Sequence, residues 1–255
     1  MKAEYRLPTQ KRDDGGRKGD GSGSRKRGSD VCLGHHRGNH GRMYRAAMRW
    51  RNVILDFDGT LVDSQSIFLS CINELGDAFG YEQIEPGPEF REKSAREVLT
   101  DVLGLLPDQV AYWAEKFKAR LNPNMEKAVT VEGMREALAT LRKDHWIGIV
   151  TSNAEETVRY VLARDGIQPV DFIWADAPIF EKDRCIEEFL AKHALSPAET
   201  IYIGDEVRDI DACRKVGIKI IAVTWGFNSK AMLEKKEPDY LVQTPTELFA
   251  ILETS

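Results

Sequence analysis

From residue 51 onward, short apolar runs alternate with stretches of helical periodicity, and this alternation strongly constrains the fold. The apolar runs predict strands at 52–56, 146–150, 172–175, 200–203, 218–223 and 239–242. The stretches between them predict helices near 131–143, 154–165, 184–194, 207–216, 229–236 and 245–253. Strands that alternate with helices form a mainly parallel sheet covered by crossover helices. We therefore predict the α/β class, with a three-layer Rossmann-like domain.

One connection in this pattern is too long for a simple crossover. About 90 residues separate the first strand from the strand at 146–150, whereas a crossover needs only a dozen or more. Residues 66–128 carry helical patterns interrupted by prolines, which predicts a small all-helical cap domain inserted between core segments 51–65 and 129–255. Ligands of open α/β sheets bind outside the carboxyl ends of the strands. A cap that leaves the core at this edge would therefore cover the site.

Residues 1–50 differ in composition from the rest of the chain. They hold thirteen Lys or Arg against five Asp or Glu, whereas the other residues carry a net charge of −13. This Gly-rich segment has too little apolar surface to offset the entropy of ordering it, so we predict a disordered basic tail. A nucleic-acid-binding arm, an organelle-targeting peptide and a passive extension ahead of Met43 or Met48 remain open, and we favour the passive extension.

The remaining composition excludes several classes of protein. No apolar stretch approaches the ~20 residues of a membrane span, and no apolar segment of a secretory signal follows the first charges. The four cysteines are scattered without metal-ligand spacing, which is typical of reduced thiols. We expect a cytoplasmic monomer or homodimer with no membrane partner, and we disfavour nucleic acid as a partner because only the basic tail could bind it.

Polar side chains follow three of the predicted strands, and a lysine follows a fourth. They are, in chain order, Asp56, Asp58, Thr151, Ser152, Asn153, Lys182, Asp205 and Asp209. Carboxylate oxygens with water suit Mg²⁺, one carboxylate can attack phosphorus, and a second can transfer a proton. A lysine, a threonine and backbone N–H groups would stabilise charge on phosphoryl oxygens. The strand ends therefore carry the parts of a phosphoryl-transfer site.

The segments VILDFDGTLVDS, IGIVTSN and YIGDEVRDID, with a lysine before the last, resemble the four motifs of the haloacid dehalogenase superfamily in order. The resemblance spans residues 52–255. It implies that Asp56 is the nucleophile and Asp58 the general acid/base. It also implies that Asp56, the backbone carbonyl of Asp58, and Asp205 bind Mg²⁺, with Asp209 assisting. The phosphoryl group or substrate would be bound by Thr151, Ser152, Asn153 and Lys182.

Three of these residues have alternative interpretations. Asp205 could cap the helix that follows it, with Asp209 one turn further on as a solvated surface residue. The lysine of the third motif is followed by Asp183 and Arg184, whereas many family members have a proline there. Lys192 or Lys143 could therefore take the place of Lys182.

The resemblance also indicates a class of reaction. Dehalogenases of this superfamily lack the second aspartate of the first motif, so the presence of Asp58 favours a phosphate ester. The position of the cap is similar to that in the helical-cap subgroup that includes phosphoglycolate phosphatase. We expect a Mg²⁺-dependent phosphatase of a small phosphorylated metabolite, with phosphoglycolate as the first substrate to try. A nucleotidase, a pyrophosphatase or a sugar-phosphate mutase remains possible on this scaffold, as does a catalytically idle binding protein with a nucleic-acid-binding arm.

The cap and one core loop contribute further candidates. Arg91, Lys93, Ser94 and Arg96 form a basic loop that could receive a substrate carboxylate, although Ser94 with Glu97 also fits an ordinary capping box. After the fifth strand, Trp225 and Phe227 could line the site or only pack under the cap.

Overall fold

The computed structural model describes residues 49–85 and 87–253. The tail was predicted for residues 1–50. Its residues 1–48, which include the alternative start positions Met43 and Met48, lie outside the described residues. Trp50, which the sequence analysis assigned to this tail, is only 3% exposed and packs in the hydrophobic core. Trp50 therefore belongs to the core domain rather than to the predicted tail.

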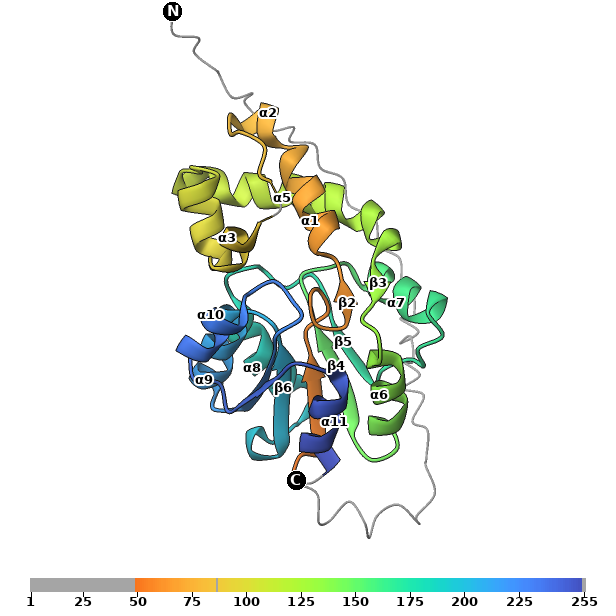
Figure 1. Ribbon diagram of the computed structural model, residues 1–255. Coiled ribbons are helices and arrows are strands. Elements are labelled where there is room, and N and C mark those ends of the chain that lie inside the picture. The colour runs from red at the N-terminus through yellow and green to blue at the C-terminus, as the bar shows by residue number, and fades with distance from the viewer. Residues whose placement is uncertain (1–48, 86, 254–255) are drawn as a thin grey trace, which may run out of the picture. The chain divides into compact units, whose positions relative to one another are not determined.

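A six-stranded parallel sheet forms the centre of the core (Figure 1). Its strand order is β5-β4-β1-β6-β7-β8. The strands span Asn52–Leu55 (β1), Trp146–Val150 (β4), Phe172–Trp174 (β5), Thr200–Gly204 (β6), Lys219–Val223 (β7) and Tyr240–Val242 (β8). All five neighbouring pairs are parallel, and β1 lies between β4 and β6. The predicted α/β, Rossmann-like fold is confirmed.

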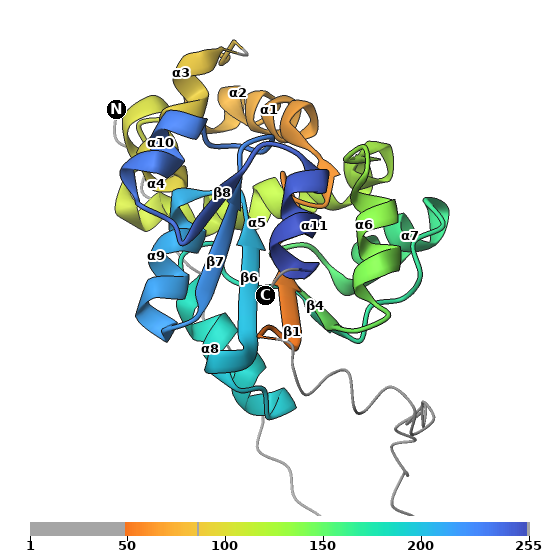
Figure 2. The ribbon, with the colours of Figure 1, turned by 60° about the horizontal axis from the view of Figure 1, so that its bottom comes forward.

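Helices cover both faces of the sheet (Figure 2). They are α6 (Met134–Leu141), α7 (Glu155–Arg164), α8 (Lys182–His193), α9 (Val207–Val216), α10 (Lys230–Lys235) and α11 (Pro245–Glu253). Successive side chains of a strand point to opposite faces, so Val53 and Leu55 pack with α6, α7 and α11, whereas Ile54 packs with α8, α9 and α10. The first strand is thus buried on both sides, which explains its continuous apolar sequence.

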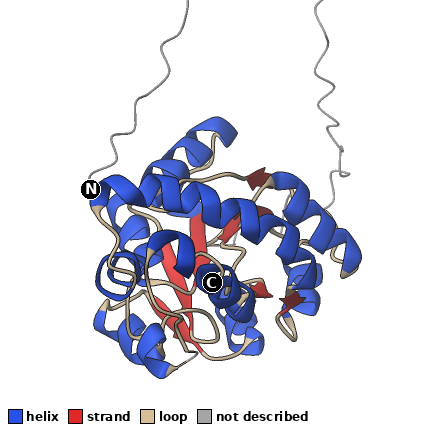
Figure 3. Cartoon of the chain, turned by 90° about the horizontal axis from the view of Figure 1, so that it is seen from above, coloured by secondary structure: helices blue, strands red, loops and turns tan. Residues whose placement is uncertain are grey.

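The chain between β1 and β4 contains the inserted helices, which lie above the sheet in Figure 1 and are seen from that side in Figure 3. They are α1 (Gln65–Asn73), α2 (Gly76–Phe79), α3 (Pro88–Arg91), α4 (Ala95–Glu97), a π-helical turn (Val98–Val102), α5 (Pro107–Asn124) and a 3₁₀ turn (Met125–Lys127). Two short strands that the sequence did not predict, β2 (Val62–Asp63) and β3 (Val129–Thr130), pair antiparallel where the chain leaves and re-enters the core. Among the described helices, none has the length and apolar composition required to cross a membrane.

Candidate active site

The first strand brings two carboxylates to the carboxyl edge of the sheet. The backbone N–H of Asp56 donates to the carbonyl of Ile203 at 2.9 Å, so the pairing with β6 continues one residue beyond β1. The chain then turns through Gly59, whose φ of +71° is the left-handed conformation that glycine adopts without strain. Asp56 and Asp58 are 3% and 5% exposed. A buried strand followed by a tight turn thus holds both carboxyl groups out of solvent.

Lys182 lies between two of the acidic side chains. It is the first residue of α8, and its Nζ is 2.5 Å from Asp56 Oδ2 and 2.5 Å from Asp209 Oδ1. Burial alone would lower the pKa of Lys182, but the Asp209 and Asp56 carboxylates raise it, so the ammonium stays charged. Burial raises the pKa of Asp56 even though Lys182 lowers it. Of the alternative lysines, Lys192 lies instead over the ring of Trp174, with its Nζ 5.4 Å from the centroid.

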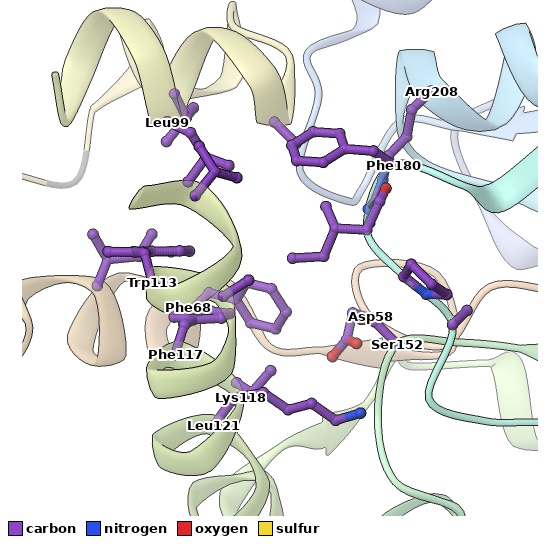
Figure 4. A pocket seen from close by; sticks show the side chains of 18 of the residues that line it. Asp58, Phe68, Leu99, Trp113, Phe117, Lys118, Leu121, Ser152, Phe180 and Arg208 are labelled. Carbon is purple, nitrogen blue, oxygen red and sulfur yellow. Dashed lines mark hydrogen bonds between the residues drawn. The ribbon is translucent and has the colours of Figure 1, made fainter. Parts of the chain in front are cut away.

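Asp58 has a different environment from Asp56. Its Oδ1 accepts a hydrogen bond from Ser64 Oγ at 2.9 Å, and its Oδ2 accepts one from Asn153 Nδ2. Burial, followed by repulsion from Asp56, raises the pKa of Asp58 to about 7. Its carboxyl group also lines the cavity between cap and core (Figure 4). Asp58 is therefore suited to give or take a proton near neutral pH.

Asp205 follows β6 and is fully buried. Its Oδ1 accepts from Thr60 Oγ1 at 2.8 Å, and its Oδ2 accepts from the backbone N–H of Phe227 at 2.7 Å. A Cβ added at Gly59 or Gly226 would come closer than 3.0 Å to this carboxylate, so both glycines are needed for the close approach. The core fits tightly around Asp205.

The capping alternative for Asp205 is wrong. Helix α9 has Glu206 as its N-cap residue, and Asp209 Oδ2 accepts from the backbone N–H of Glu206 at 3.1 Å. Asp209 is not a solvated surface residue either, because its exposed fraction is 0%. Both aspartates face the interior at the carboxyl edge of the sheet.

Asp56, Asp205 and Asp209 form a buried cluster that fits a divalent metal ion. One carboxylate oxygen from each lies within 4.8 Å of the others, and the carboxylate of Asp58 is not part of this cluster. Burial and the neighbouring Glu206, Asp56 and Asp209 raise the pKa of Asp205 well above its usual range. Carboxylate oxygens are the ligands that Mg²⁺ prefers, and a dication would offset the repulsion within the cluster.

The three residues after β4 lie beside these carboxylates. Thr151 is 1% exposed, and its Oγ1 accepts from the backbone N–H of Asn153 at 3.1 Å. Asn153 is fully buried and contacts Asp58, whereas Ser152 lines the cavity. The structure thus brings Thr151, Asn153 and Asp58 into one hydrogen-bonded group, with Ser152 at the cavity wall.

Sequence reasoning missed four residues that hold or surround the site: Thr60, Ser64, Glu206 and Arg208. Arg208 Nε donates to Glu206 Oε2 at 2.5 Å, and its Nη1 donates to the carbonyl of Ile179 at 3.0 Å. All four lie within the quoted motif segments. The direction of a side chain after a turn does not follow strand periodicity, so only their place in the motifs could have signalled them.

The residues of the basic cap loop have different roles, because some contact the core and another lines the cavity. Arg91 Nη2 donates to the carbonyls of Thr224 and Gly226, each at 3.0 Å, and Arg96 lies over the Phe180 ring at 4.9 Å from its centroid. Ser94 forms the capping box with Glu97, while Lys93 lines the cavity.

The aromatic candidates of the core loop also differ in role. Trp225 Nε1 donates to the carbonyl of Thr60 at 3.0 Å, which ties the loop after β7 to the turn after β1. Phe227 lines the cavity, and its ring centroid is 4.8 Å from that of Phe68 on α1. Trp225 therefore supports the site, whereas Phe227 forms part of the cavity wall.

Comparison with known proteins gives consistent matches. A family model described as haloacid dehalogenase-like hydrolase matches residues 53–223. A phosphoglycolate phosphatase of Synechococcus elongatus is 34% identical over 200 residues, which are 77% of this chain and 94% of the relative. Pyrophosphatase PpaX of Bacillus mycoides is 26% identical over 219 residues, covering 80% of this chain and 98% of the relative.

Solved structures match the same part of the chain. A haloacid dehalogenase-like family hydrolase from Streptococcus pneumoniae has a TM-score of 0.66 at 25% identity, over 80% of this chain and 98% of that chain. A structure described as a predicted phosphatase from Clostridium acetobutylicum has a TM-score of 0.70 at 18% identity, over 81% and 100% of the two chains, which supports the fold.

Proposed function

The chain belongs to the haloacid dehalogenase-like hydrolase family, and from this premise we propose that it is a Mg²⁺-dependent phosphatase of small phosphate monoesters. The observation that carries the proposal is the unequal environment of Asp56 and Asp58. Asp56 contacts Lys182 and belongs to the buried carboxylate cluster, whereas Asp58 is outside that cluster and faces the cavity. This difference suits a nucleophile and a proton donor that act on the same ester.

In the first step, a carboxylate oxygen of Asp56 forms a bond to phosphorus, and the bond between phosphorus and the ester oxygen breaks. Asp58 gives its proton to that leaving oxygen, which departs as the alcohol. Lys182 and Thr151 hold the phosphoryl oxygens, and backbone N–H groups of the turn after β1 stabilise their charge. When bound, Mg²⁺ neutralises the negative charge that the phosphoryl group brings to the carboxylates.

In the second step, the carboxylate of Asp58 takes a proton from water. The oxygen of that water bonds to phosphorus, the bond from phosphorus to Asp56 breaks, and inorganic phosphate leaves. Asp56 and Asp58 then return to their starting protonation states. This two-step route accounts for an aspartate pair in which one member is at the metal cluster and the other is at the cavity.

The relatives offer two substrates to compare. The relative at 34% identity is a phosphoglycolate phosphatase, and several at lower identity are pyrophosphatases. Both esters and anhydrides of phosphate fit the chemistry of the site. Pyrophosphate is therefore the second candidate, and both compounds belong in a first substrate panel.

The test is turnover of p-nitrophenyl phosphate with Mg²⁺ by the wild-type protein and two variants. Asp56→Asn keeps the shape of the side chain and removes the attacking carboxylate, so we expect a loss of kcat of at least ~10³-fold. Asp144→Asn is the matched control, because Asp144 is exposed, lies outside the four motifs and does not line the cavity. Retained turnover in Asp56→Asn, or undiminished turnover after chelation of the metal, would contradict the proposal.

A further inference from the structure

The cavity beside Asp58 carries information on the leaving group. It has a volume of about 500 Å³, within the ~300–1,000 Å³ range of pockets that bind drug-sized ligands. Because Asp58 would protonate the leaving oxygen, the alcohol part of the ester must lie on the side of Asp58 that opens into this cavity. The chemistry of the cavity wall therefore selects the alcohol. This inference rests on the proposed function.

Most of the wall is apolar. Eighteen of its 27 lining residues are apolar, and they come from both the cap and the core. Phe227, Phe68, Phe117 and Trp113 form a continuous aromatic row, with successive ring centroids 4.8, 5.2 and 4.9 Å apart. Phe180, on the core side of the cavity, faces this row in Figure 4. An apolar group in the cavity would be surrounded by rings and aliphatic side chains.

The charged groups of the wall disfavour a second anion. Five lining residues are acidic and three are basic. Two of the basic residues already have acidic partners, because Lys118 pairs with Asp176 and Arg208 pairs with Glu206. Lys93 is the third. Glu115 and Glu181 pair in turn with Lys116 and Arg184, and Asp58 is protonated when it acts as the proton donor. A carboxylate or a second phosphate on the substrate would therefore meet Lys93 and otherwise a mostly apolar wall, at the desolvation cost of a poorly paired ion.

The cap is tied to the core on both sides of the cavity. Arg91 of α3 donates to carbonyls of the loop after β7, and the backbone N–H of Ser229 donates back to the carbonyl of Arg91 at 2.9 Å. Lys118 of α5 pairs with Asp176 of the loop after β5. The apolar wall of the cap is thus held opposite Asp58.

From the size of the cavity, its aromatic row and the pairing of most of its charged groups, we propose that the preferred substrates are phosphate monoesters of uncharged, apolar alcohols. Phosphoglycolate and pyrophosphate are then poor substrates, because each places a further anion against this wall. The alcohol contacts the aromatic row, and the phosphoryl group lies at Asp56.

The experiment compares kcat/KM for ethyl, butyl, hexyl and 3-phenylpropyl phosphate with that for phosphoglycolate, all with Mg²⁺. The alkyl esters release alcohols of similar acidity, so differences among them report binding of the alkyl group rather than bond reactivity. Burial of each methylene predicts a rise of roughly fourfold, hence on the order of 200-fold from ethyl to hexyl phosphate. Phosphoglycolate is expected to fall below butyl phosphate.

Two variants on α5 test whether the cavity wall causes the rise of kcat/KM with alkyl length. Ala114 is half-buried and lines the cavity, so Ala114→Phe fills part of it and should lower the hexyl-to-ethyl ratio at least fivefold. Ala119→Phe is the matched control on the same helix, because Ala119 is exposed and does not line the cavity. The control should keep the wild-type ratio.

The outcomes separate the two proposals. If phosphoglycolate or pyrophosphate is hydrolysed well and kcat/KM does not rise with alkyl length, the leaving-group proposal is overturned. The proposed phosphatase function is then still supported. The same holds if Ala114→Phe and Ala119→Phe change the ratio alike. If none of the esters and no p-nitrophenyl phosphate is hydrolysed, the proposed function fails and the leaving-group proposal fails with it.

Discussion

The two walls of the active-site cavity differ in chemistry and in how their side chains are held. On the core side, carboxyl groups of three aspartates crowd together with Lys182, and hydrogen bonds to neighbouring side chains and backbone groups fix their positions. On the cap side, rings and aliphatic chains from α1 and α5 pack mainly against one another, although Trp113 Nε1 also donates to Tyr81 Oη at 3.1 Å. A geometry fixed by hydrogen bonds suits one reaction, whereas an apolar wall can change its shape by substitution without disturbing that reaction.

The largest expected effect comes from replacing Lys182, which contacts the carboxylate cluster. Lys182→Met leaves Asp56 and Asp209 buried without their ammonium partner, so we expect kcat to fall by at least ~10³-fold for every ester. The uncompensated charges should also lower the free energy of unfolding by about 3–5 kcal/mol. Kinetics combined with thermal unfolding check both effects.

Lys182→Arg is the matched variant, because it keeps the charge and changes the geometry. A Lys182→Met protein with near wild-type kcat would show that the core wall does not set the rate.

The next effect concerns the metal. Asp205→Asn keeps an acceptor for Thr60 and removes the negative charge, so the Mg²⁺ concentration for half-maximal activity should rise by at least the ~10–100-fold that loss of an outer-shell partner costs. Titration of activity with Mg²⁺ measures this shift. An unchanged Mg²⁺ requirement would contradict the assignment of Asp205 to the proposed metal site. The hexyl-to-ethyl ratio of kcat/KM should stay constant across the Mg²⁺ titration.

A smaller effect concerns proton transfer. The hydrogen bond from Ser64 lowers the pKa of Asp58, which burial raises to about 7, so Ser64→Ala should raise this pKa further. Asp58 then stays protonated to higher pH. For an alkyl phosphate, proton donation limits the first step, so the alkaline limb of the kcat/KM profile should move to higher pH. A limb that moves to lower pH would contradict the assignment of Asp58 as the proton donor.

The smallest effect should come from the contact between cap and core. Arg91→Met removes the hydrogen bonds from its guanidinium to the carbonyls of the loop after β7. We expect a loss of about 1–3 kcal/mol in the free energy of unfolding and a lower hexyl-to-ethyl ratio, with little change in kcat for ethyl phosphate. Equal losses for both esters would show that Arg91 supports the core wall rather than the position of the cap.

The difference between the walls also explains what could be predicted from the sequence. The core strands are continuous apolar runs, so the strand at 146–150 matched β4 residue for residue and the parallel sheet followed from the alternation. Placement of side chains at strand ends then follows from topology, which is why Asp56, Thr151 and Asp205 could be expected at one edge. The short strands β2 and β3 were missed because two residues carry no periodicity.

The cap was less accessible to sequence reasoning. Within the predicted helical segment 66–128, α4 is followed by a π-helical turn, and Gly104, at a φ of +63°, lies two residues after that turn. Arg91 and Lys93 looked alike as loop cations, yet Arg91 bonds to core carbonyls and Lys93 lines the cavity. Such choices depend on tertiary contacts, which local sequence does not encode.

The central claim is that the core wall sets the reaction and the cap wall selects the alcohol. The most direct measurement is the hexyl-to-ethyl ratio of kcat/KM in wild type, Asp205→Asn and Ala114→Phe, determined side by side at one fixed Mg²⁺ concentration that half-saturates the wild type. The account predicts that Asp205→Asn lowers both esters together and keeps the ratio, whereas Ala114→Phe lowers the ratio at least fivefold. A ratio that falls in Asp205→Asn and stays constant in Ala114→Phe would contradict it.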